Sequence, residues 1–251
     1  MLPQVDGLPA AATIHDLQHE AFPRFFTRSQ IEYRRRVYGR SVRNSRIVVT
    51  DSEHVRGELI ERYRLDPERV RVIHLAVDHE RFWPDTRRRE PFVLYPANFW
   101  AHKNHERLFE ALSLVRRERP ELRLVLCGAD HGRRRLPDGV ESHGHVPGAE
   151  LVELYRSAAA LVYPSLYEGF GIPCLEAMAC GCPVAASRVA SLPEVCGDSA
   201  VYFDPFSAEA IADGIREVLD RPPAGGVERA AGFTWERCAR EHDDVYRELI
   251  G

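Results

Sequence analysis

The sequence has a single lysine, no long apolar run and no C-x-x-C cysteine pair. Of its 34 basic residues only Lys103 is a lysine, and the others are arginine. Arginine supplies the positive charge at every other basic position. The lysine at position 103 therefore suggests that this site needs a compact ammonium group. Chance is the competing explanation for a single remaining lysine.

No apolar run approaches the roughly 20 residues that a membrane-spanning helix needs. The first residues also lack the basic start and long apolar region of a signal peptide. The net charge of -4 gives no overall reason to expect a nucleic-acid partner. These features predict a cytoplasmic protein that does not bind nucleic acid.

The cysteines are not accompanied by histidines at the spacing of a zinc site. We therefore predict that they are small core residues in a reducing compartment, rather than metal ligands or redox centres. The six positions are Cys127, Cys174, Cys180, Cys182, Cys196 and Cys238.

Apolar stretches with the period of strands alternate with stretches of helical period along nearly the whole chain. This alternation predicts α/β architecture with parallel sheets covered on both faces. The expected strands cover residues 11–16, 46–50, 70–77, 92–96, 122–127, 140–144, 160–163, 183–187 and 200–203, and the expected helices include 27–44, 105–119, 149–159, 192–196 and 234–250. Ser52 and Ser207 are expected to cap two further helices.

Two series of elements are separated by residues 78–91, which hold two prolines and a charge cluster and are interpreted as a linker. Residues 92–225 have the size of a complete domain. Residues 1–77 are shorter than the usual 100–150 residues or so, which indicates a fragment or a reduced domain. Residues 226–251 are expected to form a C-terminal helical segment.

The segment 164–183 reads PSLYEGFGIPCLEAMACGCP and places two carboxylates, Glu168 and Glu176, around a glycine turn. Gly169 and Gly171 permit close backbone approach to a ligand, and a helix that begins after them suits a phosphate. Paired carboxylates are also typical of glycoside hydrolases. The α/β alternation favours a phosphate-bearing donor over that alternative.

Four polar segments follow predicted strands: His15-Asp16, residues 98–104, 144–147 and 165–171. In open parallel sheets ligands lie at the carboxyl ends of strands, so we expect these segments to meet in one cleft. Taken singly, each has an ordinary explanation. His15 suits a strand end, and Lys103 or the glutamates suit a solvent-exposed surface.

The segment 164–184 resembles the E-x7-E signature of the retaining, nucleotide-sugar-dependent glycosyltransferases of family 4. The resemblance continues, in the order usual for that family, through residues 14–17, 46–59, 71–84, 95–112, 124–128, 144–155 and 191–205. It implies the GT-B fold, in which two Rossmann-like domains face a cleft, here with the first domain incomplete. It also implies that the C-terminal helix braces the first domain.

The resemblance assigns roles to individual residues. Lys103 would neutralise the donor diphosphate, His15 would reach the sugar from the first domain, and Glu168 would bind sugar hydroxyls. The remaining donor-binding positions would be Glu176 at the ribose, Val146 at the base, Asn98 where many relatives have arginine, and Gly169, Phe170, Gly171 and Ile172 at the sugar and diphosphate.

The expected activity is retaining transfer of a hexose, mannose or glucose, from a GDP-mannose or UDP-glucose type of donor. The acceptor would be a hydroxyl of a saccharide or lipid-linked molecule in polysaccharide or glycoconjugate synthesis. No D-x-D motif is present, and neither a metal nor a cofactor is expected.

The alternative function is a non-catalytic or truncated sugar-nucleotide-binding module that needs a partner chain, because much of the usual first domain is missing. A homo-oligomer or a partner chain would then complete that domain. Two arginine clusters, 87–89 and 133–135, suggest peripheral contact with the inner face of the membrane. A solvated surface is the competing explanation for those clusters.

Overall fold

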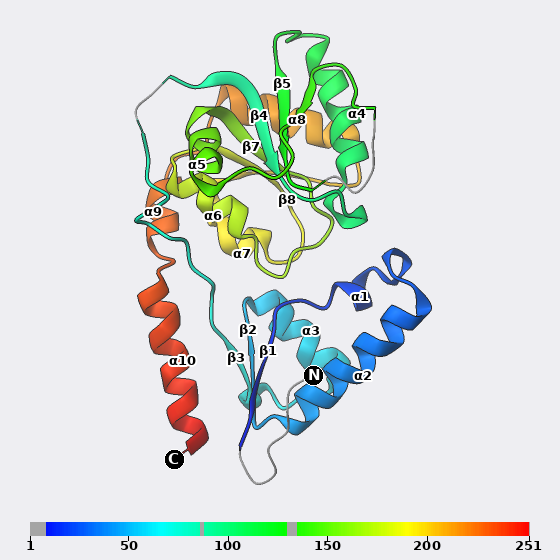
Figure 1. Ribbon diagram of the computed structural model, residues 1–251, viewed down its shortest axis with the longest axis vertical. Coiled ribbons are helices and arrows are strands. Elements are labelled where there is room, and N and C mark those ends of the chain that lie inside the picture. Colours follow the sequence, from blue (N-terminus) through cyan, green and yellow to red (C-terminus); the bar gives the residue numbers. More distant parts are fainter. Residues whose placement is uncertain (1–8, 86–87, 130–134, 251) are drawn as a thin grey trace.

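The computed structural model describes residues 9–85, 88–129 and 135–250, and these residues form two parallel sheets (Figure 1). The first sheet has the order β1-β2-β3, and the second has the order β6-β5-β4-β7-β8-β9. The strands are β1 (Ala11–Ile14), β2 (Ile47–Thr50), β3 (Val70–Val72), β4 (Glu90–Pro96), β5 (Arg123–Cys127), β6 (Val140–Ser142), β7 (Ala158–Tyr163), β8 (Val184–Ser187) and β9 (Val201–Phe203). The predicted parallel α/β architecture is confirmed.

We call residues 9–77, with β1–β3, the N-terminal unit, and residues 90–231, with β4–β9, the C-terminal unit. The helices are α1 (Gln18–Ala21), α2 (Arg28–Asn44), α3 (Glu53–Tyr63), α4 (His105–Arg116), α5 (Gly148–Ser157), α6 (Ile172–Ala179), α7 (Leu192–Cys196), α8 (Ala208–Asp220), α9 (Gly226–Ala231) and α10 (Trp235–Ile250). Short 3-10 turns cover Pro23–Phe25, Pro67–Arg69, Ala101–Lys103 and Gly197–Ser199.

Serine caps mark the starts of α3 and α8. The Ser52 hydroxyl accepts from the Val55 amide at 3.2 Å, and the Ser207 hydroxyl accepts from the Ala210 amide at 3.1 Å, so both predicted caps are confirmed. Such caps satisfy one of the amides that a helix start leaves without an intrahelical partner.

Several element boundaries differ from the prediction. The strand predicted over residues 70–77 ends at Val72, because the chain then leaves the first sheet and the Val77 amide donates to the Phe233 carbonyl at 3.3 Å. The strand predicted over residues 92–96 begins at Glu90, which pairs with Ala158 of β7. Helix α9 begins the C-terminal helical segment expected over residues 226–251, and the last helix starts at Trp235 rather than at Thr234.

The helix α10 crosses from the C-terminal unit to the first sheet and packs on it (Figure 1). Successive residues of β2 point to opposite faces of the sheet. Ile47 and Val49 contact the α10 residues Val245 and Leu249, whereas Val48 packs with α3 on the other face. Since both faces are covered, β2 is buried along its whole length.

All six cysteines are buried and free of disulfides, which confirms that they are small core residues. Burial raises the pKa of the Cys180 thiol to about 12, so it stays protonated and unreactive. Within the described ranges, no helix is long and apolar enough to cross a membrane. Arg87, Arg133 and Arg134 of the predicted membrane-contact clusters lie outside the described residues.

Candidate functional site

A pocket of about 480 Å³ lies where the N-terminal and C-terminal units face each other at the carboxyl ends of their strands. His15, directly after β1, comes from the N-terminal unit. The C-terminal unit contributes segments after β4 and β7, the neighbouring strands where its strand order changes direction. Nine of the ten predicted site residues line the pocket: His15, Asn98, Lys103, Val146, Glu168, Gly169, Phe170, Gly171 and Ile172.

Lys103 and Glu168 form an ion pair in the wall of the pocket. The Lys103 ammonium lies 2.6 Å from Glu168 Oε1 and donates to the Tyr163 hydroxyl at 3.2 Å. The side chains of Lys103 and Glu168 are only 12% and 13% exposed, so water screens this pair less than a surface pair. The Tyr95 hydroxyl donates to the Lys103 carbonyl at 2.7 Å and fixes the turn that carries the lysine.

His15 is held by the carboxylate of Asp51, which follows β2. His15 Nδ1 lies 2.8 Å from Asp51 Oδ2, and this hydrogen bond raises the pKa of His15 more than partial burial lowers it. Donation from Nδ1 leaves Nε2 available to another group, and the His15 side chain is 66% exposed. The neighbouring strands are tied at this end because the Thr50 hydroxyl donates to the Ile14 carbonyl at 2.8 Å.

Helix α6 starts at the edge of the pocket. Its N-cap, Gly171, has φ of 119°, a conformation that side-chain-bearing residues rarely adopt. Ile172 and Pro173 of its first turn line the pocket, so the positive end of the helix faces the ligand space. This arrangement suits an anionic group close to Lys103.

Two of the predicted site residues, Glu176 and Asn98, form hydrogen bonds within the C-terminal unit. Glu176 does not line the pocket; its carboxylate accepts from the buried Tyr155 hydroxyl at 2.9 Å, and burial raises its pKa. Asn98 lines the pocket while its amide oxygen accepts from the Ala129 amide at 2.7 Å. Asn98 thus joins the loops after β4 and β5.

Asp51 and Tyr163 line the pocket but lie outside the segments predicted for the cleft, whereas Trp100 and His145 fall within the predicted segments 98–104 and 144–147. Asp51 directly follows β2, at the same sheet edge as His15. The rule that ligands lie at strand ends would have found it, and also Tyr163 at the end of β7. Within the described ranges, no group of three or more His, Cys, Asp or Glu residues is placed to hold a metal ion.

The loop between β7 and α6 touches the N-terminal unit directly. The Ser52 hydroxyl donates to the Gly169 carbonyl at 2.8 Å, and the Leu17 amide donates to the Tyr167 hydroxyl at 3.1 Å. A Cβ atom added to Gly169 would lie 2.0 Å from the His15 carbonyl oxygen, so only glycine permits this approach. The two walls of the pocket are therefore in backbone contact.

Residues 78–231 match the family model described as "Glycosyl transferases group 1". The chain belongs to this family. Residues 2–81 also match the model described as "Glycosyltransferase Family 4". The resemblance seen in the sequence is thereby confirmed for both parts of the chain.

Curated relatives of this group 1 member include mannosyltransferases. The O-antigen chain mannosyltransferase B of Escherichia coli is 29% identical, over 96% of this chain and 70% of its own length. The O-antigen chain mannosyltransferase RfbU of Salmonella typhimurium is 31% identical, over 95% of this chain and 67% of its own length. A D-inositol 3-phosphate glycosyltransferase of Corynebacterium glutamicum is 28% identical, over 83% of this chain and only 59% of its own length.

Solved glycosyltransferase structures share the fold. Sucrose-phosphate synthase from Thermosynechococcus elongatus superposes with a TM-score of 0.77 at 25% identity, over 96% of this chain and 67% of that one. Anabaena Alr3699/HepE, solved in complex with UDP-glucose, superposes with a TM-score of 0.77 at 16% identity, over 96% of this chain and 72% of that one. The expected GT-B fold is confirmed, with a first sheet of three strands in the described residues.

Proposed function

We propose that this chain is a retaining glycosyltransferase that moves a hexose from a nucleotide-diphosphate sugar to a hydroxyl acceptor. The observation that carries the proposal is the pocket itself, in which Lys103, Glu168 and the start of α6 face His15 across one space. The similarity to O-antigen chain mannosyltransferases favours mannose as the sugar and a saccharide or lipid-linked acceptor.

In the proposed reaction the bond between the anomeric carbon and the diphosphate oxygen breaks while the acceptor oxygen bonds to the same face of that carbon. The acceptor proton passes to the departing diphosphate oxygen. Negative charge grows on the diphosphate, where the Lys103 ammonium and the amides of the first turn of α6 stabilise it. We propose that these groups serve in place of a metal ion.

The carboxylates have separate proposed tasks. A diphosphate bound to Lys103 competes with Glu168 for the ammonium, which frees Glu168 to accept hydrogen bonds from sugar hydroxyls. His15, oriented by Asp51, would contact the sugar from the opposite wall. Glu176 lies one turn along α6 from Ile172, and we propose that the ribose reaches it beside the Tyr155 hydroxyl.

A second function is a sugar-nucleotide-binding module that needs a partner chain. The observation that favours it is the first sheet, which has three strands in the described residues against six in the second. Both functions require donor binding. Only the enzyme releases nucleoside diphosphate at a rate that depends on an acceptor.

The test starts from a thermal-shift screen against GDP-mannose, UDP-glucose and related donors, because a ligand that binds the folded state raises the melting temperature. Release of nucleoside diphosphate from the stabilising donor is then measured with saccharide acceptors. Lys103→Ala should lower turnover by about 10²–10³, the scale of one preorganised charge stabiliser. Near-normal turnover by that variant would refute the role of Lys103.

Arg117→Ala provides the matched control, because it removes one positive charge from an exposed site at the end of α4. Its turnover should equal that of the unaltered chain. Donor binding by the unaltered chain without acceptor-dependent release would instead support the binding module.

A further inference from the structure

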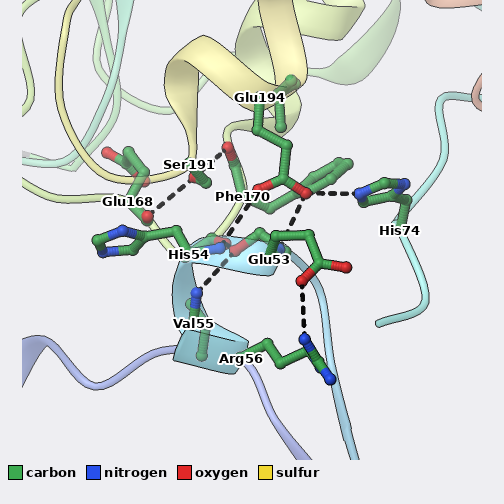
Figure 2. A network of polar contacts seen from close by, with 12 residues as sticks. Glu53, His54, Val55, Arg56, His74, Glu168, Phe170, Ser191 and Glu194 are labelled. Atoms are coloured by element: carbon green, nitrogen blue, oxygen red, sulfur yellow. Dashed lines mark hydrogen bonds and ion pairs between the residues drawn. The ribbon is translucent and has the colours of Figure 1, made fainter. Parts of the chain in front are cut away.

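Glu194 of the C-terminal unit reaches across to the N-terminal unit (Figure 2). It lies on α7, and its Oε1 accepts from the Glu53 amide at 2.9 Å while its Oε2 accepts from the His54 amide at 3.3 Å. Oε1 also lies 2.7 Å from His74 Nε2. One carboxylate thus joins three groups of the other unit.

The two amides belong to the first turn of α3, where helix amides have no intrahelical acceptor. Ser52, the cap within the same unit, accepts only from the Val55 amide at 3.2 Å. Glu194 supplies the acceptor for Glu53 and His54, and a carboxylate is favoured at the positive end of a helix. The start of α3 is therefore capped by both units, at Val55 by Ser52 and at Glu53 and His54 by Glu194.

Electrostatics agree with this arrangement. Burial favours the protonated form of Glu194, but the hydrogen bonds from His74 and the two amides outweigh it and hold the pKa of the carboxyl below its usual range. The side chains of His74 and Glu194 are 27% and 23% exposed, so the contact is only partly screened by water.

The start of α7 also contacts the loop that carries Glu168, the loop between β7 and α6. The Ser191 hydroxyl, just before α7, lies 2.9 Å from the Glu168 carbonyl oxygen and 2.6 Å from that of Phe170 (Figure 2). The His74 ring lies against the Phe170 ring, with centroids 5.8 Å apart. Ser191, Glu194 and His74 therefore form a continuous connection from the pocket loop to the N-terminal unit.

We propose that Glu194 is a positioning residue that fixes the orientation of the N-terminal unit, and with it His15, relative to Glu168. Its catalytic consequence rests on the proposed transferase function. Glu194 does not line the pocket, so it acts through the groups that it holds rather than by touching substrate.

The experiment compares Glu194→Ala, Glu194→Gln and the control Glu53→Ala in the full chain. Glu53 carries a carboxylate on the same helix turn, but its side chain pairs only with Arg56 of the same helix, at 3.4 Å. Glutamine keeps one acceptor oxygen, whereas Glu194 uses both of its oxygens for the two amides, and it loses the charge. Glu194→Gln should therefore restore only part of the slow exchange and the narrow distance distribution that Glu194→Ala loses.

Four measurements are made on each variant. Hydrogen exchange follows the amides of residues 53 and 54, and spin labels at Arg36→Cys on α2 and Ser113→Cys on α4 report the distance between the units. Both labelled positions are exposed, whereas all six native cysteines are buried. Acceptor-dependent transfer is measured as kcat/KM, with donor affinity measured separately.

For Glu194→Ala we expect at least roughly 10-fold faster exchange at the two amides and a broader distance distribution. We also expect about a 10²-fold lower kcat/KM, the effect of a misplacement near 1 Å. Donor affinity should change less than kcat/KM, because every proposed donor-facing residue except His15 lies in the C-terminal unit. Glu53→Ala should match the unaltered chain in all four measurements.

Unchanged exchange and an unchanged distance distribution in Glu194→Ala would overturn the inference. A broader distribution with normal kcat/KM would overturn its catalytic consequence. If the unaltered chain transfers no sugar but Glu194→Ala still broadens the distribution, the orientation role stands and the proposed function fails.

Discussion

Replacing Gly169 with alanine should push apart the two walls of the pocket. A Cβ atom at this position would lie 2.0 Å from the His15 carbonyl oxygen and 3.2 Å from the Asp16 Cβ. Real Cβ atoms essentially never approach closer than 3.0 Å, so the contact opens by about 1 Å. The obstructing atom is backbone at the end of β1, and no side-chain rotation relieves the clash.

The expected effect on catalysis is large and that on stability is moderate. A displacement near 1 Å at the reacting groups lowers kcat/KM by about 10²-fold. Forcing a methyl group into a packed site costs about 1–3 kcal/mol of the free energy of unfolding. Each kcal/mol lowers the melting temperature by roughly 2–4 °C in a chain of this size.

The assay pairs acceptor-dependent transfer with thermal unfolding, and Gly57→Ala is the control. A Cβ atom at Gly57 meets no atom within 4 Å, and the residue lies within α3. The control should gain about 0.5–1 kcal/mol, because alanine favours a helix interior over glycine. Full transfer and an unchanged melting temperature in Gly169→Ala would refute the argument from backbone contact.

Two further predictions concern hydrogen-bonded pairs of side chains. Asp51→Ala removes the hydrogen bond that raises the pKa of His15, so the NMR titration midpoint of His15 should fall. The stability that the pair contributes is present below about pH 6.5 and is lost as pH rises through the raised pKa. An unmoved midpoint would contradict this. Tyr155→Phe removes a donor to Glu176 and should lower the free energy of unfolding by about 1.5–3 kcal/mol. Burial raises the pKa of Glu176, so this loss should shrink in urea unfolding as pH falls through that pKa, and a loss independent of pH would exclude Glu176 as the cause.

Features encoded over a few residues could be predicted from the sequence. Ser52 and Ser207 each precede an apolar helical pattern and cap a helix through an amide three residues along the chain. The alternation of strand and helix was sufficient to predict parallel sheets. Because the carboxyl ends of parallel strands mark the ligand site, His15 and Lys103 were predicted to share one pocket, and both line it.

Contacts between distant residues could not be predicted in the same way. Glu194 meets Glu53 across a separation of 141 residues, and no periodic pattern encodes which carboxylate reaches a given helix start. The Tyr155 hydroxyl meets Glu176 because α5 and α6 pack together, which depends on the register of the whole second sheet. The early end of β3 also involves a distant residue, because the Val77 amide donates to the carbonyl of Phe233, near the start of α10.

The pairing of Lys103 with Glu168 gives the single lysine a more specific task than charge neutralisation alone. An ammonium has three donors on a flexible stem, so it can exchange a carboxylate for a phosphate oxygen without a fixed bidentate geometry. Arginine would bind Glu168 through a rigid planar fork and release it less readily. Under the proposed function, donor binding and the release of Glu168 toward the sugar are then one exchange at the Lys103 Nζ, which lies 2.6 Å from Glu168 Oε1.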